Sequence, residues 1–309
     1  MTVAQHLAHL VEKAESRIRP HTKTTPLHAT KLGGQRKKYP VHLKLENLQH
    51  TGSFKARGSL NKLKSLTPDD RSRHIYTAST GNHGMGVARA LGITGVQGTV
   101  YLPKNAADKK VAKLRSAGAS LKFIEGGPLD SELTAKAEAA ISNGVWVSPY
   151  NDIEIVAGQG TIGVELVKQA KDIQRVFATV GGGGLISGIA GYLKNHNPEI
   201  EIVGCVPENS PEMMLSVEAG HIVHLENPKE TLSDGSAGGA EDGSITLEFC
   251  QKLVDSWIAV TEEEIAEAMA LVQKTDGYSI EGSAGVAVAA CLKSGKETSG
   301  DIVIICGGL

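Results

Sequence analysis

Three separate segments of the sequence carry residue types that could hold and activate a small carbonyl compound. Residues 52–55 (Gly-Ser-Phe-Lys) end in a lysine that supplies a primary amine. Residues 79–84 (Ser-Thr-Gly-Asn-His-Gly) form a polar loop, and residues 181–184 are four consecutive glycines. An amine, a loop of hydroxyl and amide groups, and a run of backbone N–H groups are the parts that hold a phosphorylated aldehyde cofactor as a Schiff base. Their occurrence in this order predicts such a cofactor.

The glycine run favours an anion site over an ordinary turn. It follows an apolar strand expected at 175–180 and precedes a helix expected at 186–193, so its N–H groups lie at a helix N-terminus, where phosphate binds favourably. One glycine would suffice for a turn, and four cost much backbone entropy. The dinucleotide pattern GxGxxG fails at Ile186 or Ser187, and GxxxxGK does not occur in the sequence. We therefore expect the phosphate of a small cofactor.

The other two segments also have ordinary interpretations. A lysine at a helix start is usually a solvated surface residue, and Lys55 gains interest from Phe54, which could desolvate the amine and keep it nucleophilic. Ser79 or Thr80 alone would be a helix cap, whereas the whole loop could bind a substrate carboxylate through its N–H groups. His83 could act as a general base, but it has no visible partner and is expected to be structural.

The composition indicates a soluble α/β enzyme with many tight turns, because 40% of the 309 residues are hydrophobic and 36 are glycine. A net charge of -2 provides no electrostatic footprint for nucleic acid or an anionic membrane. The four cysteines are far apart and form no CxxC pair, which argues against zinc and disulfides and for a reducing compartment. Without a signal-peptide pattern or a membrane-spanning apolar run, we expect a cytoplasmic protein.

The apolar periodicity predicts alternating helices and strands. A helix at 3–18 opens the chain, an irregular segment lies between Pro20 and Pro26, and a short helix begins at Lys55. Strands are expected at 41–45, 74–77, 98–102, 120–124, 145–148, 175–180, 201–206, 257–260 and 302–305. Further helices are expected at 84–91, 107–117, 131–143, 159–170, 186–193, 262–274 and 283–292. Such alternation predicts parallel strands in two sheets, the middle one inserted into the other, with ligands at the carboxyl ends of strands.

Four segments together resemble the fold-type II family of pyridoxal-phosphate enzymes: residues 52–58 (GSFKARG), 79–84, 157–161 (AGQGT) and the glycine run. The resemblance extends from about residue 15 to the end and is greatest to the serine/threonine dehydratase (ammonia-lyase) and serine racemase branch. It implies an α/β, tryptophan-synthase-β-like fold with two open, twisted, mostly parallel sheets. It also implies a homodimer, with a large cofactor-binding domain at 1–73 and 147–309 and a small mobile domain at 74–146 that closes over the substrate.

The resemblance implies a role for each matching residue around pyridoxal 5'-phosphate. Lys55, beside Phe54, would form the Schiff base, and Asn82 would bond the cofactor's 3'-oxygen. Glu281 would lie near the ring, and Gly235 would lie in a turn packed against the Schiff base. The phosphate would be held by Gly181, Gly182, Gly183, Gly184 and Leu185, with Ser53 nearby. The substrate would be bound by Ser79, Thr80, Gly81, Asn82 and His83.

Cys306 and Thr80 bear on the type of reaction. Cys306 matches a position beside the pyridine nitrogen where this branch has serine, cysteine or threonine, and such a neutral partner favours elimination of a β-hydroxyl over transamination. Thr80 stands where the racemases have a serine that acts as the acid/base on the opposite face of the substrate. The Thr80 hydroxyl could still donate a proton, so racemisation is less expected but stays open.

The activity implied by the resemblance is that of a lyase which converts a serine- or threonine-like β-hydroxy α-amino acid into a 2-oxo acid and ammonia. Residues 207–211 and 232–239 are most similar to dehydratases of the hydroxyectoine-utilisation and phenylserine type. No metal is expected, because Val206 replaces a glutamate that binds a divalent cation in many relatives, although Glu208 and Glu212 are near. The alternatives are a serine racemase, a β-replacement synthase of the same fold and a non-enzymatic amino-acid sensor.

Overall fold

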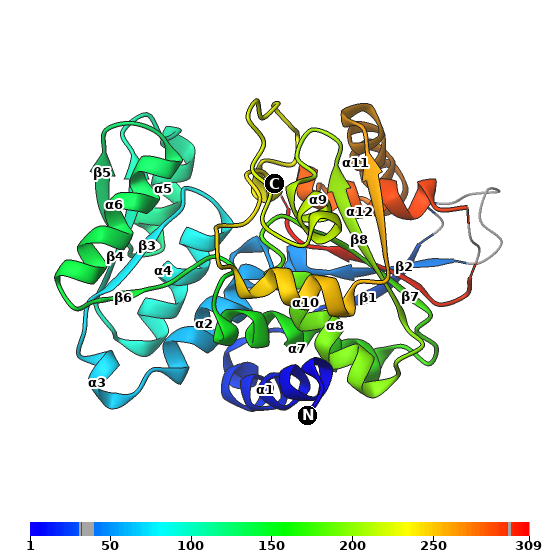
Figure 1. Ribbon diagram of the computed structural model, residues 1–309, viewed down its shortest axis with the longest axis horizontal. Helices are drawn as coiled ribbons and strands as arrows, with labels where there is room; N and C mark the ends of the chain where they lie inside the picture. Colours follow the sequence, from blue (N-terminus) through cyan, green and yellow to red (C-terminus); the bar gives the residue numbers. More distant parts are fainter. Residues whose placement is uncertain (31, 33–39, 296–297, 309) are drawn as a thin grey trace.

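The computed structural model describes residues 1–30, 32, 40–295 and 298–308 of the chain, which folds into two sheets lying side by side (Figure 1). The larger sheet has the strand order β1-β2-β10-β7-β8-β9, and the smaller has the order β5-β4-β3-β6. Only β1, at the edge of the larger sheet, pairs antiparallel; every other pairing between the described strands is parallel. The expected α/β class with two mostly parallel sheets is confirmed.

The strands agree closely with the sequence prediction, except that β1 was not expected. The strands are β1 (Leu27–Thr30), β2 (Val41–Leu45), β3 (Ile75–Ala78), β4 (Gly98–Pro103), β5 (Ser120–Ile124), β6 (Val145–Trp146), β7 (Arg175–Thr179), β8 (Glu201–Pro207), β9 (Ser256–Val260) and β10 (Asp301–Ile305). The four strands of the smaller sheet lie in sequence between β2 and β7, so this sheet is an insertion into the larger one. The exact domain limits at 73/74 and 146/147 stay a prediction.

The helices connect these strands. They are α1 (Val3–Ile18), α2 (Lys55–Ser65), α3 (Pro68–Arg71), α4 (Asn82–Thr94), α5 (Asp108–Ser116), α6 (Pro128–Ile141), α7 (Ile153–Gln169), α8 (Gly184–His196), α9 (Glu212–Ala219), α10 (Ile245–Leu253), α11 (Glu262–Asp276) and α12 (Gly282–Lys293), with short 3₁₀ turns η1 (Arg19–His21), η3 (Glu46–Leu48), η4 (His50–Gly52) and η5 (Asp234–Ser236). Helix α7 begins six residues before the expected start at 159, because Asp152 caps it by accepting hydrogen bonds from the N–H groups of Glu154 and Ile155. No helix in the described part of the chain has the length and hydropathy needed to cross a bilayer.

Both faces of the larger sheet are covered by helices. Helices α1, α7, α8 and α10 lie on one side, and α11 and α12 lie on the other (Figure 1). Every residue of β7 and β10 is accordingly buried, as expected for central parallel strands covered on both faces. Helix α2 packs against α7 at a point where a Cβ on Gly158 would lie only 2.6 Å from the Cα of Gly58. The glycines therefore let these two helices approach to backbone contact.

A buried network of charges lies between α2, α7 and β2. Arg57, which is fully buried in α2, donates from Nε and Nη2 to the two carboxylate oxygens of Glu46, each at 2.7 Å, and from Nη1 to Glu165 at 2.8 Å. Lys44 of β2 donates from Nζ to the other oxygen of Glu165 at 2.5 Å. Although burial opposes ionisation of Glu165, Arg57 and Lys44 lower the pKa of its carboxyl to about 2. The network thus fixes α2, whose first residue is Lys55, to the larger sheet.

Removal of Glu165 should destabilise the protein strongly. Glu165→Ala removes the carboxylate that pairs with the buried Lys44, and it leaves Arg57 with Glu46 as its one remaining carboxylate partner. Breaking a buried ion pair in this way costs about 3–5 kcal/mol. Glu248→Ala, which removes the exposed α10 ion pair with Lys252, is the matched control and should cost at most about 1 kcal/mol. Denaturant unfolding measures both changes. Equal small losses in the two variants would contradict the role given to the network.

Candidate active site

Lys55 lies where the carboxyl ends of strands from both sheets meet. The segment before it is bonded to the segment after β10: the Phe54 N–H donates to the Cys306 carbonyl at 3.1 Å, and the Gly308 N–H donates to the Gly52 carbonyl at 3.1 Å. The Lys55 Nζ donates at 2.8 Å to the carbonyl of Pro149, in the segment that follows β6 of the smaller sheet. This is the region where parallel α/β folds bind their ligands.

The surroundings of Lys55 favour a neutral amine. Burial lowers the pKa of Lys55 to about 8, against the opposing effect of Cys306 and Glu281. The Phe54 ring centroid lies 5.1 Å from Nζ, so the ring covers one side of the amine, and its cation–π attraction opposes the effect of burial. The hydrogen-bond partner is a carbonyl oxygen, which accepts from an ammonium or an amine alike. The site can therefore supply a nucleophile or a proton acceptor near neutral pH.

The glycine run forms a tight turn between β7 and α8. Gly183 adopts a φ of +82°, and α8 begins at Gly184. A Cβ on Gly182 would lie 2.3 Å from Cγ of Tyr150, and one on Gly181 would lie 2.5 Å from the carbonyl oxygen of Ser236. Because no side chain fits at these positions, the N–H groups at the start of this 13-residue helix can line an anion site. Leu185 follows and is buried.

The polar loop at 79–81 ends β3 and leads directly into α4. Ser79 Oγ accepts from the Gly81 N–H at 3.1 Å, and Gly84 packs so closely that a Cβ there would lie 2.3 Å from the Ser79 carbonyl oxygen. The first N–H groups of α4, from Asn82 onward, have no acceptor within the helix. The loop is thus shaped to present N–H groups and the partly exposed Thr80 hydroxyl to a small anion.

Asn82, Glu281 and Cys306 come together from three distant segments. The Asn82 Nδ2 donates to one oxygen of Glu281 at 2.8 Å, and the Cys306 Sγ lies 3.7 Å from the other. Burial raises the pKa of Glu281, and burial together with Glu281 raises the pKa of Cys306, which stays a thiol. A Cβ on Gly235 would lie 4.0 Å from a Glu281 oxygen, so the η5 turn borders the same cluster.

His83 faces the backbone rather than the loop opening. The imidazole is buried, and its Nε2 hydrogen-bonds the Val147 carbonyl at 3.1 Å. Burial, with Lys55 as a second cause, lowers the pKa of His83 to about 3, so the ring is neutral. The His83 Nδ1 is buried and has no hydrogen-bond partner among the described residues, so both the structural interpretation of His83 and its role in substrate binding stay predictions.

Several buried polar atoms around Lys55 lack a hydrogen-bond partner among the described residues, namely Thr51 Oγ1, Ser53 Oγ, Ser59 Oγ and His83 Nδ1, and a bound group would satisfy the one nearest the phosphate. Ser53 Oγ is buried beside Lys55 in sequence and lacks a hydrogen-bond partner among the described residues. Buried polar atoms of this kind usually find a partner, so a phosphate oxygen is a reasonable one. The described residues contain no group of three or more His, Cys, Asp or Glu side chains able to hold a metal ion. Near Val206, the buried Glu212 accepts instead from Ser210 Oγ at 2.6 Å.

Sequence reasoning did not find several neighbours of the site. The Pro149 carbonyl is a backbone atom and has no residue-type signal. Ser236 lies against the glycine run, whereas the sequence indicated only that its neighbour Gly235 lies near the Schiff base. Thr51 adopts a φ of 69°, which is unusual for a β-branched residue and stores strain just before Lys55. The Tyr150 ring lies against Gly182, and an isolated tyrosine after a strand gives no sequence signal of such a contact.

Comparison with known proteins agrees with this geometry. Residues 18–308 match the family described as "Pyridoxal-phosphate dependent enzyme". The L-threonine ammonia-lyase of Thermotoga maritima is 40% identical over 273 residues, which cover 87% of this chain and 67% of that protein. The processed form of threonine deaminase isoform 2 from Solanum lycopersicum superposes with a TM-score of 0.92 at 29% identity, over 99% of this chain and 85% of that chain. The serine racemase of Dictyostelium discoideum gives a TM-score of 0.89 at 30% identity, over 97% of both chains.

Gly182→Ala should weaken phosphate binding at the glycine run without affecting the rest of the fold. The new Cβ would meet the Tyr150 ring at 2.3 Å, so either the ring or the turn must shift, and we expect pyridoxal phosphate to bind at least about tenfold more weakly, a loss of about 1.4 kcal/mol. Gly92→Ala in α4 is the control, because a Cβ there has no neighbour within 4 Å. Titration of the cofactor-free protein measures both affinities. Wild-type affinity in Gly182→Ala would exclude this turn as the phosphate site.

Proposed function

The chain belongs to the pyridoxal-phosphate dependent enzyme family, and from this we propose that it is a lyase that converts a β-hydroxy α-amino acid into a 2-oxo acid and ammonia. The observation that carries the proposal is the convergence, where the two sheets meet, of a partly buried amine at Lys55, the glycine turn and the Asn82–Glu281–Cys306 cluster. The 40% identity to an L-threonine ammonia-lyase supports this reaction and a serine- or threonine-like substrate.

The residues of the site fit pyridoxal phosphate. Lys55 would carry it, residues 181–185 with Ser53 would hold its phosphate, and the Asn82–Glu281–Cys306 cluster would border its ring, with Gly235 beside it. The cofactor, when bound, supplies an electron sink for the electrons left when a substrate loses its Cα proton. The support on this chain is the helix N-terminus of α8 and the unpartnered buried Ser53 hydroxyl.

Lys55 is proposed as the base. With its pKa lowered to about 8, a useful fraction of the amine is neutral near neutral pH and can accept the Cα proton at Nζ. Pro149 orients the amine without adding a negative charge that would hold the proton.

The polar loop is proposed to hold the substrate. The first N–H groups of α4, with Ser79, Gly81 and Asn82, would bind the carboxylate and orient Cα toward Lys55. Cys306 would contribute an uncharged thiol rather than a carboxylate near the ring nitrogen, which favours loss of a β-hydroxyl over transamination. The small domain at 74–146 is proposed to close over the bound substrate, and we propose a cytoplasmic homodimer.

Serine racemisation is the second candidate, supported by the likeness to the racemase of Dictyostelium discoideum. It requires an acid/base on the face of the substrate opposite Lys55, and Thr80 is the residue of the loop with a hydroxyl at the matching position. Thr80→Ala would abolish racemisation while leaving Lys55 in place. Chiral chromatography after incubation with L-serine distinguishes a racemase from a pure lyase.

A panel of hydroxyamino acids tests the proposal. L-serine, L-threonine, D-serine, 3-hydroxyaspartate and phenylserine are each incubated with the holoenzyme, and ammonia and 2-oxo acid are measured. We expect release from at least one L-hydroxyamino acid, reduced by a factor of about 10²–10⁴ in Lys55→Ala because the base is lost. Lys64→Ala, on the same helix, should retain activity. Equal inactivity of the wild type on every compound would refute the lyase.

A further inference from the structure

The loop between α9 and α10 lies between the glycine turn and the smaller sheet. Its η5 turn contacts the site directly, because a Cβ on Gly181 would collide with the Ser236 backbone. Beyond this turn, the loop enters α10 at Ile245. Residues 237–244, between this turn and α10, include Glu241 and contribute no side chain to the site described above.

Glu241 binds both the smaller sheet and the segment that leads into α7. Its carboxylate forms an ion pair with Lys136 of α6, the helix that packs on the smaller sheet. The other carboxylate oxygen accepts from Asn151 Nδ2 at 2.8 Å. Side-chain exposure is 28% for Lys136 and 31% for Glu241, so the pair is partly shielded from water. The two contacts join parts of the chain 105 and 90 residues apart.

The backbone of Glu241 extends this connection to the glycine turn. Its N–H donates to the Tyr150 hydroxyl at 2.8 Å. The Tyr150 ring in turn occupies the space that a side chain on Gly182 would need. The Tyr150 Cα would also lie 3.0 Å from a Cβ on Gly184. A continuous path of contacts therefore runs from Lys136 through Glu241 and Tyr150 to the glycines. A second, more exposed pair, Lys110 with Asp234 at 3.3 Å, links α5 to the η5 turn.

We propose that Glu241, paired with Lys136, is a positioning residue that couples the location of the smaller sheet to the geometry of the glycine turn. The inference rests on the proposed function, in which this turn holds the cofactor phosphate. When the smaller sheet is docked, Lys136 fixes Glu241, which holds Tyr150 against Gly182. When the pair is broken, Tyr150 loses this restraint and the turn binds phosphate less well. Docking of the smaller sheet and cofactor binding therefore favour each other.

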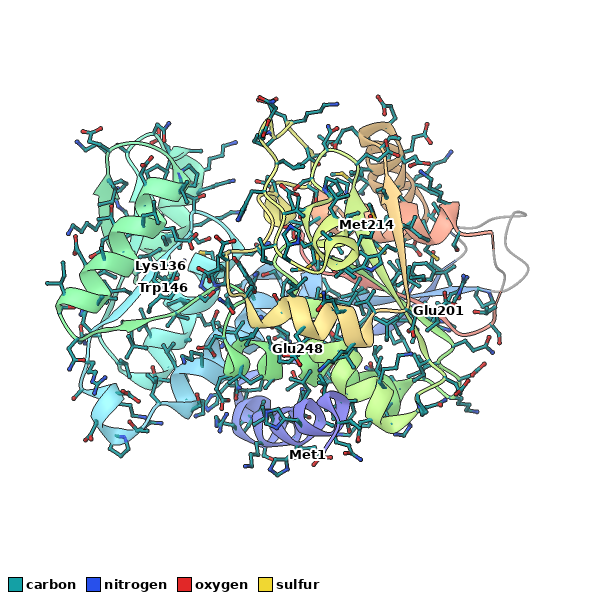
Figure 2. All side chains as sticks on the ribbon, in the orientation of Figure 1. Met1, Lys136, Trp146, Glu201, Met214 and Glu248 are labelled. Atoms are coloured by element: carbon teal, nitrogen blue, oxygen red, sulfur yellow. The ribbon has the colours of Figure 1, made fainter. Side chains whose placement is uncertain are left out.

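Lys136 also provides a reporter of docking. Its Nζ lies 5.4 Å from the ring centroid of Trp146 in β6, and Figure 2 labels the two residues next to each other, on the smaller-sheet side of the 233–244 loop. The sequence contains two tryptophans. In a Trp257→Phe background, the emission of Trp146 therefore reports the environment of Lys136 and of the adjoining loop.

The test compares two carboxylates that share one lysine. Lys136 also pairs with Glu132 in its own helix at 2.7 Å, so Glu132→Gln removes a similar charge without touching the loop. Pyridoxal phosphate affinity of the cofactor-free protein and Trp146 emission are measured for Glu241→Gln, Glu132→Gln, Lys136→Met and the Glu241→Gln/Lys136→Met double variant. Binding is read directly, so the result is independent of whether the lyase reaction occurs. Thermal unfolding verifies that each variant is folded.

We expect Glu241→Gln to weaken cofactor binding about fivefold, the upper range for a partly exposed pair, and to shift Trp146 emission. Glu132→Gln should leave affinity within a factor of about two. Adding Lys136→Met to Glu241→Gln should not lower the affinity for pyridoxal phosphate any further, because the two residues act through one contact. Wild-type affinity in Glu241→Gln, or an equal loss in Glu132→Gln, would overturn the proposal. If Glu241→Gln does not fold, Tyr150→Phe takes its place, because this change removes only the hydroxyl that accepts from the Glu241 N–H. We then expect Tyr150→Phe to weaken pyridoxal phosphate binding, and unchanged affinity in that variant would overturn the proposal.

Discussion

The site depends on one electrostatic arrangement: a primary amine that is partly buried and not paired with a carboxylate. The chain contains a direct contrast. Burial lowers the pKa of both Lys44 and Lys55, but Lys44 donates to Glu165 at 2.5 Å and is held as a charged structural group. Lys55 donates to the Pro149 carbonyl, and its pKa falls to about 8. Lys44 is fully buried and donates to a carboxylate, the Thr25 carbonyl and Gln169, whereas Lys55 is partly buried and donates to a carbonyl alone. The same residue type is therefore structural in one place and available for reaction in the other.

Holding such an amine in place requires a rigid base, and α2 supplies it. Arg57, about half a turn beyond Lys55, forms a buried two-pronged pair with Glu46 and a further bond to Glu165. The segment before Lys55 is bonded to the end of β10, so Lys55 is fixed from both directions. A buried ion network contributes less net stability than its number of bonds suggests, but it specifies one arrangement of α2 against the sheet. The contacts from Lys136 of α6 through Glu241 to Tyr150 would hold the glycine turn in one position in the same way.

The sequence predicted the parts of the site that consist of unusual residue types. Four consecutive glycines and a strand–loop–helix pattern around Asn82 are compatible with few arrangements other than a ligand site, and both lie at strand ends as expected. The short edge strand β1 was missed because its residues follow Pro26 and three of its four positions are incompletely buried, so they show little apolar pattern. The Pro149 carbonyl carries no residue-type signal. The Glu241–Lys136 pair joins residues 105 positions apart, and local periodicity contains no information about such contacts.

The pH dependence of covalent attachment at Lys55 tests the central claim most directly. Cofactor-free protein is mixed with pyridoxal phosphate across a pH series, the product is reduced with borohydride, and the modified peptide is identified by mass spectrometry. Because only the neutral amine attacks an aldehyde, modification at Lys55 should become faster with rising pH, with a midpoint at about 8. A midpoint near 10.5, the ordinary value for lysine, or modification at a different lysine, would contradict the account.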